Sequence, residues 1–345
     1  MAEIYVGISG INAVDNPGPG VGVARSLHED PDLKVHVVGL AYDTQEPGIY
    51  MDWVINKAFI MPYPSADAEA YLQRLHYIKH SYGLDVVLPC LDAELPFFTK
   101  YQHEIAALGI RTFLPTLDQF NLRGKDRLAD IAEAIQVSIP PTKVVTSLAE
   151  LHRAVERIGL PVMVKGAFYK AYKAYTYQEA VAHYHKLVAE WGYPVIVQGM
   201  VFGEEMNVVA VGDGQGELLG QVGIKKMWIT SLGKIWTGVT IKNERMRDVT
   251  ANFIRRYRWK GPLEMECMVD GDTVYLIEIN PRFPAWSYFA TGVGVNLPAN
   301  IIRKIYQLPL PATFDYDPGK LYIRYTDELV TDMQMFQKIT TQGEN

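Results

Sequence analysis

The chain has 345 residues, of which 48% are hydrophobic and 21% are charged, enough for two or three soluble globular domains. The formal net charge of −6 argues against general binding to nucleic acids or anionic membranes, because those partners favour basic surfaces. The amino-terminal apolar stretch is too short for a signal peptide, and no run of about 18 apolar residues is present to span a membrane.

Strand-like and helix-like segments alternate over residues 1–115. Helical patterns lie around Ala24–His28 and Tyr71–Tyr82. Four apolar runs predict buried strands: "EIYVGIS", "LKVHVVGL", "LDVVLPCLD" and "IRTFLP". This alternation predicts a parallel sheet with helices on its faces. Cys90 and Cys267 both lie in apolar strand-like stretches, so we expect two core thiols in a reducing cytoplasm.

Further elements follow after residue 115. Leu128, Ile131, Ala132 and Ile135 have the spacing of one face of an amphipathic helix. Then come a strand, a helix and a strand: "GLPVMVKGAF", "YQEAVAHYHKLVAEW" and "PVIVQGMV". From about 205 the signals are mostly strands, with "GDGQG" and "VDGDT" as hairpin turns. The tail from Pro309 carries a strand candidate, "KLYIRY", and a polar end that we expect to fray.

The glycine turn "DNPGPGVGVARS" follows the first strand and resembles a dinucleotide-binding turn. Its spacing fails the G-x-G-x-x-G pattern, since the third position is Val23 when counted from Gly18 and Arg25 when counted from Gly20. Asp43 ends the second strand where a ribose-binding acid would stand. A nicotinamide-dependent oxidoreductase therefore stays only as a disfavoured alternative.

The strongest chemical signal is "PLEMECMVDGDTVYLIEINPRF", residues 262–283. Glu278, Asn280 and Arg282 alternate along a predicted strand and so project from one face. The Glu278 carboxylate and the Asn280 amide oxygen, with a second carboxylate from Glu266, suit Mg²⁺, and the arginine is placed to hold phosphate oxygens. Glu266 joins this face if a three-residue turn, Gly271–Thr273, connects the strands. The alternative is an edge strand with a solvated polar face.

"LIEINPR", with a glutamate twelve residues before its own, resembles the metal-binding end of the ATP-grasp superfamily. The wider pattern is similar to the carbamoyl-phosphate synthase and biotin carboxylase branch in a short, stand-alone form, over about residues 3–310. The resemblance implies an α/β plus α+β fold, with a parallel-sheet, Rossmann-like pre-ATP-grasp domain before a two-subdomain ATP-grasp fold. The expected parts are the pre-ATP-grasp domain (residues 1–115) and the small lid subdomain (116–194). The metal-binding subdomain (195–310) and a C-terminal strand with a tail (311–345) follow.

The same resemblance implies a set of nucleotide-binding residues. In "GKDRLADIAEA", Lys125 is a phosphate ligand, and in "LPVMVKG" Lys165 is a second one. Met163 shares a face with Lys165 and would pack against adenine, while Val162 and Val164 face a core. The backbone of Gln198, Gly199, Met200 and Val201 would contact the edge of adenine. Glu205 would bind the ribose hydroxyls, and Lys226 would be a further phosphate ligand.

Two further regions bear on substrate and turnover. Asp92 and Glu94 follow a strand and are candidates for binding an amine or ammonium group, and the glycine turn, through Gly20 and Gly22, is a candidate for a substrate carboxylate. The lid stretch 166–178 departs from the family pattern, because it has one glycine followed by tyrosines and lysines. A phosphate loop built from backbone N–H groups is therefore not expected there. Either Lys170 or Lys173 supplies the charge instead, or the stretch is an ordinary exposed turn.

The resemblance implies an ATP-dependent, ADP-forming ligase that joins a carboxylate to an amine, or less often to a thiol, through an acyl phosphate. Mg²⁺, two ions in all and replaceable by Mn²⁺, would be held by Glu266, Glu278 and Asn280, and Arg282 and Lys165 would be catalytic. The expected partners are a small-molecule or peptide carboxylate and an amine, with no nucleic acid and no membrane, and the chain could form a homodimer. A non-catalytic MgATP-binding or regulatory protein is the main alternative.

Overall fold

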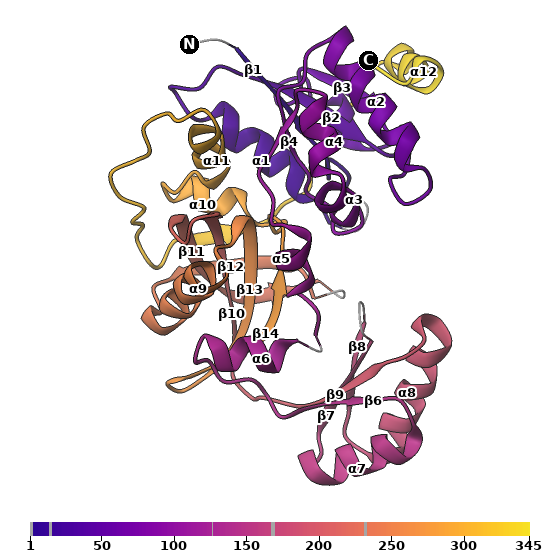
Figure 1. Cartoon of the computed structure of the whole chain (residues 1–345), viewed down its shortest axis with the longest axis vertical. Coiled ribbons are helices and arrows are strands. Elements are labelled where there is room, and N and C mark those ends of the chain that lie inside the picture. Colours follow the sequence, from indigo (N-terminus) through magenta and orange to yellow (C-terminus); the bar gives the residue numbers. More distant parts are fainter. Residues whose placement is uncertain (1–2, 14–15, 126, 167–169, 231–232) are drawn as a thin grey trace. The chain divides into compact units, whose positions relative to one another are not determined.

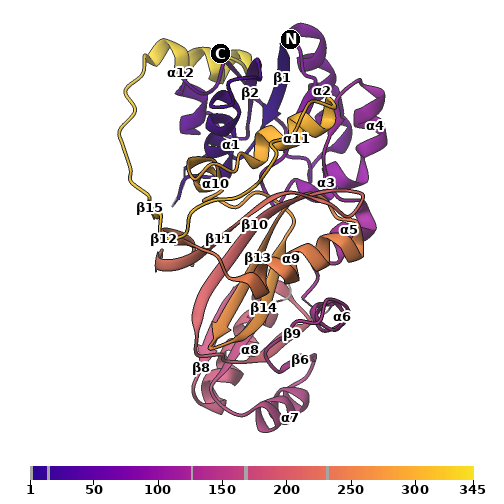
Figure 2. The ribbon, with the colours of Figure 1, turned by 90° about the vertical axis from the view of Figure 1, so that its left-hand side faces the viewer.

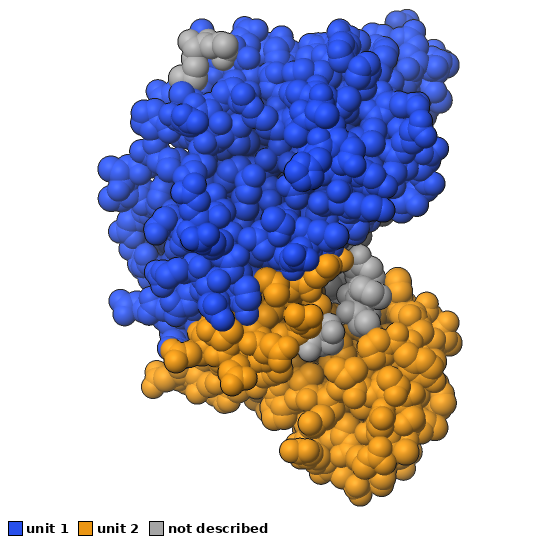
Figure 3. All heavy atoms as spheres, in the orientation of Figure 1, with its two compact units in different colours: residues 1–120, 208–264, 280–345 blue, residues 121–207, 265–279 orange. Residues whose placement is uncertain are grey.

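The computed structural model describes residues 3–13, 16–125, 127–166, 170–230 and 233–345 (Figure 1). The chain divides into two compact units, coloured separately in Figure 3. Unit 1 contains Met1–Phe120, Val208–Glu264 and Asn280–Asn345, and unit 2 contains Asn121–Asn207 and Met265–Ile279.

Unit 1 begins with the predicted parallel sheet. The strands are β1 (Ile4–Ile8), β2 (Val35–Ala41), β3 (Lys57–Ile60), β4 (Val86–Leu88) and β5 (Arg111–Thr112). Their order is β3-β2-β1-β4-β5, and every pair is parallel. The predicted alternation is confirmed, although β3 has no counterpart among the four predicted strands.

Helices cover both faces of this sheet. One face packs against α1 (Pro19–His28), and α11 (Leu297–Ile305) lies beside that helix (Figure 2). The other face packs against α2 (Ala68–Ser81), α3 (Leu95–Lys100) and α4 (Gln102–Ala107). The short elements of this region are η1 (Pro47–Tyr50) and α5 (Leu117–Asn121).

A six-stranded sheet has the order β14-β13-β10-β11-β12-β15. Three of its strands cross the limits between the units: β10 (Glu204–Asp213), β13 (Lys260–Asp270) and β14 (Thr273–Asn280). The others lie in unit 1: β11 (Leu218–Ile229), β12 (Ile235–Ile241) and β15 (Leu321–Ile323). The expectation of mostly strands after 205 overlooked several helices, which are α9 (Glu244–Tyr257), α10 (Tyr288–Gly292), α11 and α12 (Met333–Gln342).

Unit 2 contains a four-stranded antiparallel sheet with the order β6-β9-β7-β8. The strands are β6 (Thr142–Val145), β7 (Val162–Gly166), β8 (Ala171–Ala174) and β9 (Val195–Gly199). The helices α7 (Leu148–Ile158) and α8 (Tyr177–Trp191) pack on one face, where Val162 and Val164 are fully buried as predicted. The other helix of this unit is α6 (Leu128–Ala134), whose predicted apolar face is buried.

The polar tail is ordered, so the expectation that it frays is wrong. It forms α12, and Arg74 on α2 donates a hydrogen bond of 2.6 Å to the Gly343 carbonyl. Asn345 then accepts a bond from the Ala58 amide through its side-chain oxygen, at 2.7 Å. Polar side chains and backbone groups make these contacts, which is why apolar patterning did not reveal them. Across the described ranges, none of the helices is both long and apolar enough to cross a lipid bilayer.

Candidate functional site

Lys165 lies on β7 in unit 2, on the face opposite the valines that pack against α7 and α8. Its side chain is 8% exposed, and its ammonium group donates a hydrogen bond of 2.6 Å to Gln198 Oε1. Gln198 lies on the neighbouring strand β9, opposite Met163, and donates from Nε2 to Thr142 Oγ1 at 3.0 Å. Met163 and Lys165 thus lie on one face of the sheet, as predicted, and Gln198 lies on the same face.

Charged side chains from distant parts of the sequence surround this lysine in unit 2. Burial lowers the pKa of Lys165 to about 8, and the positive charge of Lys125 acts in the same direction. The carboxylates of Glu278, Glu266 and Glu205 act in the opposite direction and favour the charged form. Lys125 also lies 3.8 Å from Glu278. We call these five residues the Lys165 group.

The two glutamates of the predicted metal strand belong to this group. Between β13 and β14 lie only Gly271 and Asp272, so the predicted three-residue turn is one residue too long. The side chains of Asn280 and Glu264 nevertheless meet on one face of the two strands, as they would in the predicted register centred on Asp272. Asn280 Nδ2 donates to Glu264 Oε2 at 3.4 Å, and these two residues are equidistant from Asp272, as are Glu266 and Glu278.

The Lys165 group fits a divalent cation with bound phosphates. Two carboxylates supply hard oxygen ligands, and two lysines supply positive charge for phosphate oxygens. Within the described ranges, no three His, Cys, Asp or Glu side chains gather closely enough to hold a metal by themselves. Phosphate and amide oxygens would therefore have to complete the coordination, as is usual for Mg²⁺ with nucleotides.

The predicted adenine-reading segment, Gln198–Val201, is partly engaged in unit 2. The Gly199 N–H donates to the Pro141 carbonyl at 2.8 Å, and the Met200 N–H donates to the Pro161 carbonyl at 3.3 Å. The N–H groups of Gly199 and Met200 are therefore not available to adenine, and the predicted role of the rest of the segment stays a prediction. Glu205 is the second residue of β10 (Glu204–Asp213) and is one of the carboxylates that act on Lys165, while its predicted contact with the ribose stays a prediction.

Two further charges were predicted from the sequence, Lys226 and Lys170. Lys226 is on β11 in unit 1, opposite Gly238, at an irregularity of the β11–β12 pairing. Lys170, from the lid stretch, forms an ion pair of 2.7 Å with Glu190 on α8. Residues 167–169 of that stretch lie outside the described residues, so the predicted absence of a phosphate loop stays a prediction.

Arg282 lies in unit 1, just past the end of β14, so the predicted strand alternation ends at Asn280. Its guanidinium donates to Asp92 at 3.2 Å and to Glu264 at 3.0 Å. Glu264 is 4% exposed and also accepts a bond of 2.7 Å from the Trp286 indole. Sequence reasoning missed Glu264, although it occupies the strand position two before Glu266 and so faces the same side.

Asp92 and Glu94 were predicted to bind an amine, and the structure gives both of them other contacts. Asp92 holds Arg282, as described above. Glu94 is 1% exposed and accepts bonds from the Ser9 hydroxyl, from the Cys90 and Leu91 amides at 2.8 and 2.9 Å, and from the Tyr42 hydroxyl at 2.6 Å. With four donors on its two oxygens, Glu94 fixes the loop after β4 and is not a direct amine ligand.

Gly20 and Gly22 are required for close packing, and their predicted role in binding a substrate carboxylate stays a prediction. A Cβ on Gly20 would lie 2.1 Å from the Ser9 carbonyl oxygen, and the Gly20 N–H already donates to Gly10 O at 2.9 Å. Gly22 lies inside α1, where a Cβ would meet the Tyr288 Cβ at 3.1 Å. The turn therefore needs glycine so that α1 can approach the end of β1 and α10.

No protein-family model matches the sequence. The solved structures similar to this chain include N5-carboxyaminoimidazole ribonucleotide synthetase from Thermus thermophilus, with a TM-score of 0.69 and 18% identity over 92% of this chain and 81% of that one. Biotin carboxylase from Campylobacter jejuni has a TM-score of 0.70 and 13% identity over 92% and 74%. L-amino acid ligase from Bacillus licheniformis has a TM-score of 0.64 and 16% identity over 87% and 73%.

Among curated proteins, the carbamoyl phosphate synthase large chain of Clostridium acetobutylicum is 26% identical to this chain over 189 residues. The match covers 50% of this chain and only 18% of that synthase. These likenesses establish the fold and agree with the resemblance carried by residues 262–283.

Proposed function

We propose that this chain, whose fold is the ATP-grasp fold, is an ADP-forming ligase that joins a carboxylate to an amine. The observation that carries the proposal is the Lys165 group, in which two lysines and three glutamates gather on one side of unit 2. Several proteins with similar structures are named as synthetases, carboxylases or ligases, one of them an L-amino acid ligase, which supports the same chemistry.

The proposed reaction has two steps. A carboxylate oxygen of the substrate attacks the γ-phosphorus of ATP, and the bond to ADP breaks to give an acyl phosphate. The nitrogen of the amine then attacks the acyl carbon, loses a proton and displaces inorganic phosphate. The positive charges of Lys125 and Lys165 would stabilise the negative charge on the transferring group and on ADP. A side-chain nucleophile is not required.

Glu266, Glu278 and Asn280 would hold Mg²⁺, for which we propose two ions with Mn²⁺ as a substitute. When bound, the metal neutralises phosphate charge and aligns the transferring group. Glu205 would accept hydrogen bonds from the ribose, and Met163 would pack against adenine. Arg282 would hold phosphate oxygens while Asp92 and Glu264 keep its guanidinium in place.

The substitution Glu278→Gln tests the proposed metal site. It removes one negative charge while keeping the shape of the side chain, so we expect ADP release to fall by at least about 100-fold, since a metal ligand is lost. The assay follows ADP formed from MgATP in the presence of pooled carboxylates and amines. Glu133→Gln, at an exposed position on α6, is the matched control and should keep wild-type turnover. Near-wild-type activity of Glu278→Gln would remove Glu278 from the site.

A non-catalytic MgATP-binding protein remains the second candidate, because the lid stretch lacks the family's glycines and its Lys170 is paired with Glu190. The two functions separate in one experiment. Saturable ATP binding without any ADP release, whichever carboxylate and amine are added, would favour the binding protein. ADP release that depends on both co-substrates would favour the ligase.

A further inference from the structure

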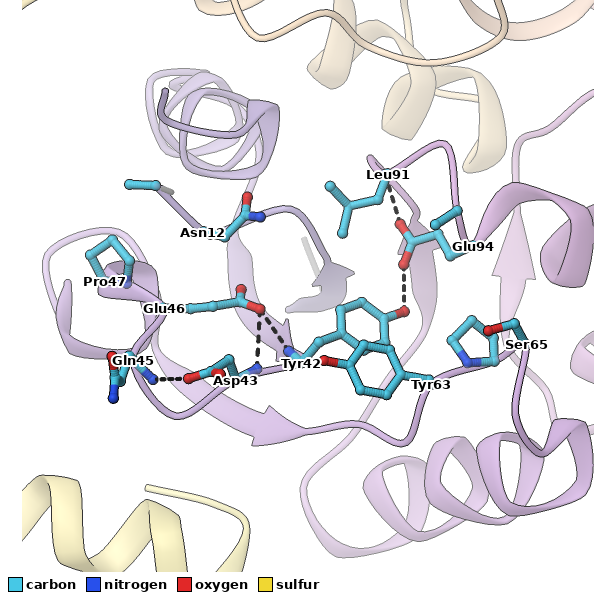
Figure 4. A pocket seen from close by; sticks show the side chains of 13 residues that line it. Asn12, Tyr42, Asp43, Gln45, Glu46, Pro47, Tyr63, Ser65, Leu91 and Glu94 are labelled. Atoms are coloured by element: carbon cyan, nitrogen blue, oxygen red, sulfur yellow. Dashed lines mark hydrogen bonds between the residues drawn. The ribbon is translucent and has the colours of Figure 1, made fainter. Parts of the chain in front are cut away.

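Unit 1 contains a pocket of about 590 Å³ at the carboxyl ends of its parallel strands (Figure 4). Its walls come from the segments that follow β1, β2, β3 and β4, represented by Asn12, Glu46, Tyr63 and Leu91. Pockets for small ligands usually measure about 300–1,000 Å³, and open α/β sheets bind ligands at this edge. The pocket is thus large enough for a small metabolite.

Glu46 lines this pocket and is a buried polar residue with one carboxylate oxygen that has no hydrogen-bond partner in the described part of the chain. It is 6% exposed, and its Oε1 accepts from the Tyr42 and Asp43 amides at 2.7 and 3.3 Å. Its Oε2 is buried and has no hydrogen-bond partner among the described residues. Figure 4 shows the carboxylate directed into the pocket. Because buried polar atoms in proteins are nearly always paired, this oxygen indicates that a ligand donor belongs here.

The charge of the walls determines what kind of donor fits. Asp43 and Glu94 line the pocket together with Glu46, and none of its described lining residues is Lys, Arg or His. An anionic ligand would be repelled here, whereas a cation would gain attraction from each carboxylate. The Glu94 oxygens are already occupied by four donors, so the Glu46 Oε2 is left as the acceptor for a bound group.

Aromatic side chains line the same pocket. The Tyr63 ring stacks on the Tyr42 ring with centroids 5.5 Å apart and planes 12° from parallel. Tyr63 is 60% exposed, which leaves much of its surface available to a ligand. Aromatic faces attract cations and apolar groups alike. The remaining apolar wall includes Pro47, Leu91 and Ala93.

We propose that this pocket binds a small molecule with a primary ammonium group, which donates a hydrogen bond to Glu46 Oε2 while its apolar body lies against Tyr63 and Leu91. This molecule is the amine co-substrate of the ligase, an assignment that rests on the proposed function. A bare metal ion would leave most of the pocket's volume and its aromatic wall unused.

Binding should depend on pH through Glu46. Burial raises the pKa of Glu46 to about 7, with the charges of Asp43 and Glu94 adding to the rise and the amides of Tyr42 and Asp43 opposing it. The lining residues that follow β1 and β3 are uncharged in the described part of the pocket. An ammonium group prefers the ionised carboxylate, so amine affinity should increase as the pH rises from 6 to 8.

The test is isothermal titration calorimetry of the full chain at pH 8 with phenethylamine, tyramine and cadaverine, each beside its N-acetylated form. Cadaverine is acetylated at both ends. We expect at least one amine to bind, its acetylated form to bind at least tenfold more weakly, and Glu46→Gln to weaken the amine at least tenfold. Glu69→Gln, exposed on α2, should leave the affinity unchanged. Asp43→Asn should lower the amine affinity by a smaller factor, about threefold. This second variant tests the pocket even if Glu46→Gln is unstable.

Three results would overturn the proposal: no binding by any of the amines, equal binding of the acetylated forms, or unchanged binding by Glu46→Gln. A parallel titration with MgATP keeps the two proposals apart. Amine binding without ATP binding would refute the ligase and leave the pocket assignment standing. ATP binding with intact turnover but without amine binding would refute the pocket assignment alone.

Discussion

Lys165 keeps a positive charge at neutral pH although its side chain is almost completely buried. Its pKa of about 8 lies below the ordinary value of 10.5 because burial disfavours the ammonium form. The folded protein therefore binds this proton less tightly than the unfolded chain does. The free energy of unfolding should rise as the pH increases from about 8 to 10.5, and the cost of the buried charge is present in full below 8. A bound phosphate would offset that cost.

ATP affinity should consequently fall as the pH rises above 8. Once Lys165 loses its proton, the phosphates lose a cationic ligand, and the expected loss approaches tenfold for each pH unit. Lys165→Met should bind ATP at least about tenfold more weakly at pH 7 and should lack this pH dependence. Equilibrium titration with ATP between pH 7 and 9.5 measures both effects.

The matched control is Lys143→Met, at an exposed position on β6 of the same unit. It should retain both the wild-type affinity and the wild-type pH profile. An unchanged affinity and pH profile in Lys165→Met would show that Lys165 does not contact the nucleotide.

Individual residues of the candidate site could be predicted where a motif and a strand alternation agreed. Lys165, Glu266 and Glu278 fall into this class, and the structure brings them together in unit 2. Glu46 could not be predicted, because it lies in an irregular segment after β2 and only the fold places it beside Glu94 and Tyr63. For Glu94, the sequence indicated the correct edge of the sheet but not the four donors that occupy its carboxylate.

At the scale of elements, the first turn of α1 shows why glycine is needed where two backbones approach closely. A side chain at position 20 would collide with the backbone at the end of β1, and backbone atoms cannot move aside without shifting the strand. Gly20→Ala should therefore lower the free energy of unfolding by more than about 2 kcal/mol. Urea unfolding followed by circular dichroism measures the change.

Gly292→Ala is the comparison for that experiment. Gly292 is helical in α10, and a Cβ there would have no heavy atom within 4 Å. Its unfolding midpoint should stay the same or rise slightly, because alanine favours helix. Equal midpoints for the two variants would contradict the packing role of Gly20.

Elements with a regular apolar pattern were predictable, and α8 matches its predicted stretch from Tyr177 to Trp191. The helix α9 was missed in a region where the strand signals dominated, although Met246, Val249 and Phe253 form its buried stripe. The position of α12 depends on two hydrogen bonds between groups far apart in the sequence, one from Arg74 to the Gly343 carbonyl and one from the Ala58 amide to the Asn345 side chain. Pairings of that kind leave no periodicity in the sequence.

At the scale of the whole molecule, the Lys165 group and the Glu46 pocket fall in different compact units. The Lys165 group belongs to unit 2, although its members are spread over residues 125–278, and the Glu46 pocket belongs to unit 1. The parallel sheet could be predicted from the alternation of elements, whereas the antiparallel pairing of β6, β7, β8 and β9 could not. The division into four parts at residues 115, 194 and 310 remains a prediction.

The most direct test of the proposed ligase is ADP release from MgATP with pooled carboxylates and pooled amines, added separately and together, with mass detection of the products. We predict release at least about tenfold faster with both pools than with either alone, together with a product whose mass is that of the two substrates less one water. Failure of every carboxylate and amine pair to stimulate ADP release, while ATP still binds, would contradict it. Tight binding of a nicotinamide cofactor without ATP binding would contradict it as well.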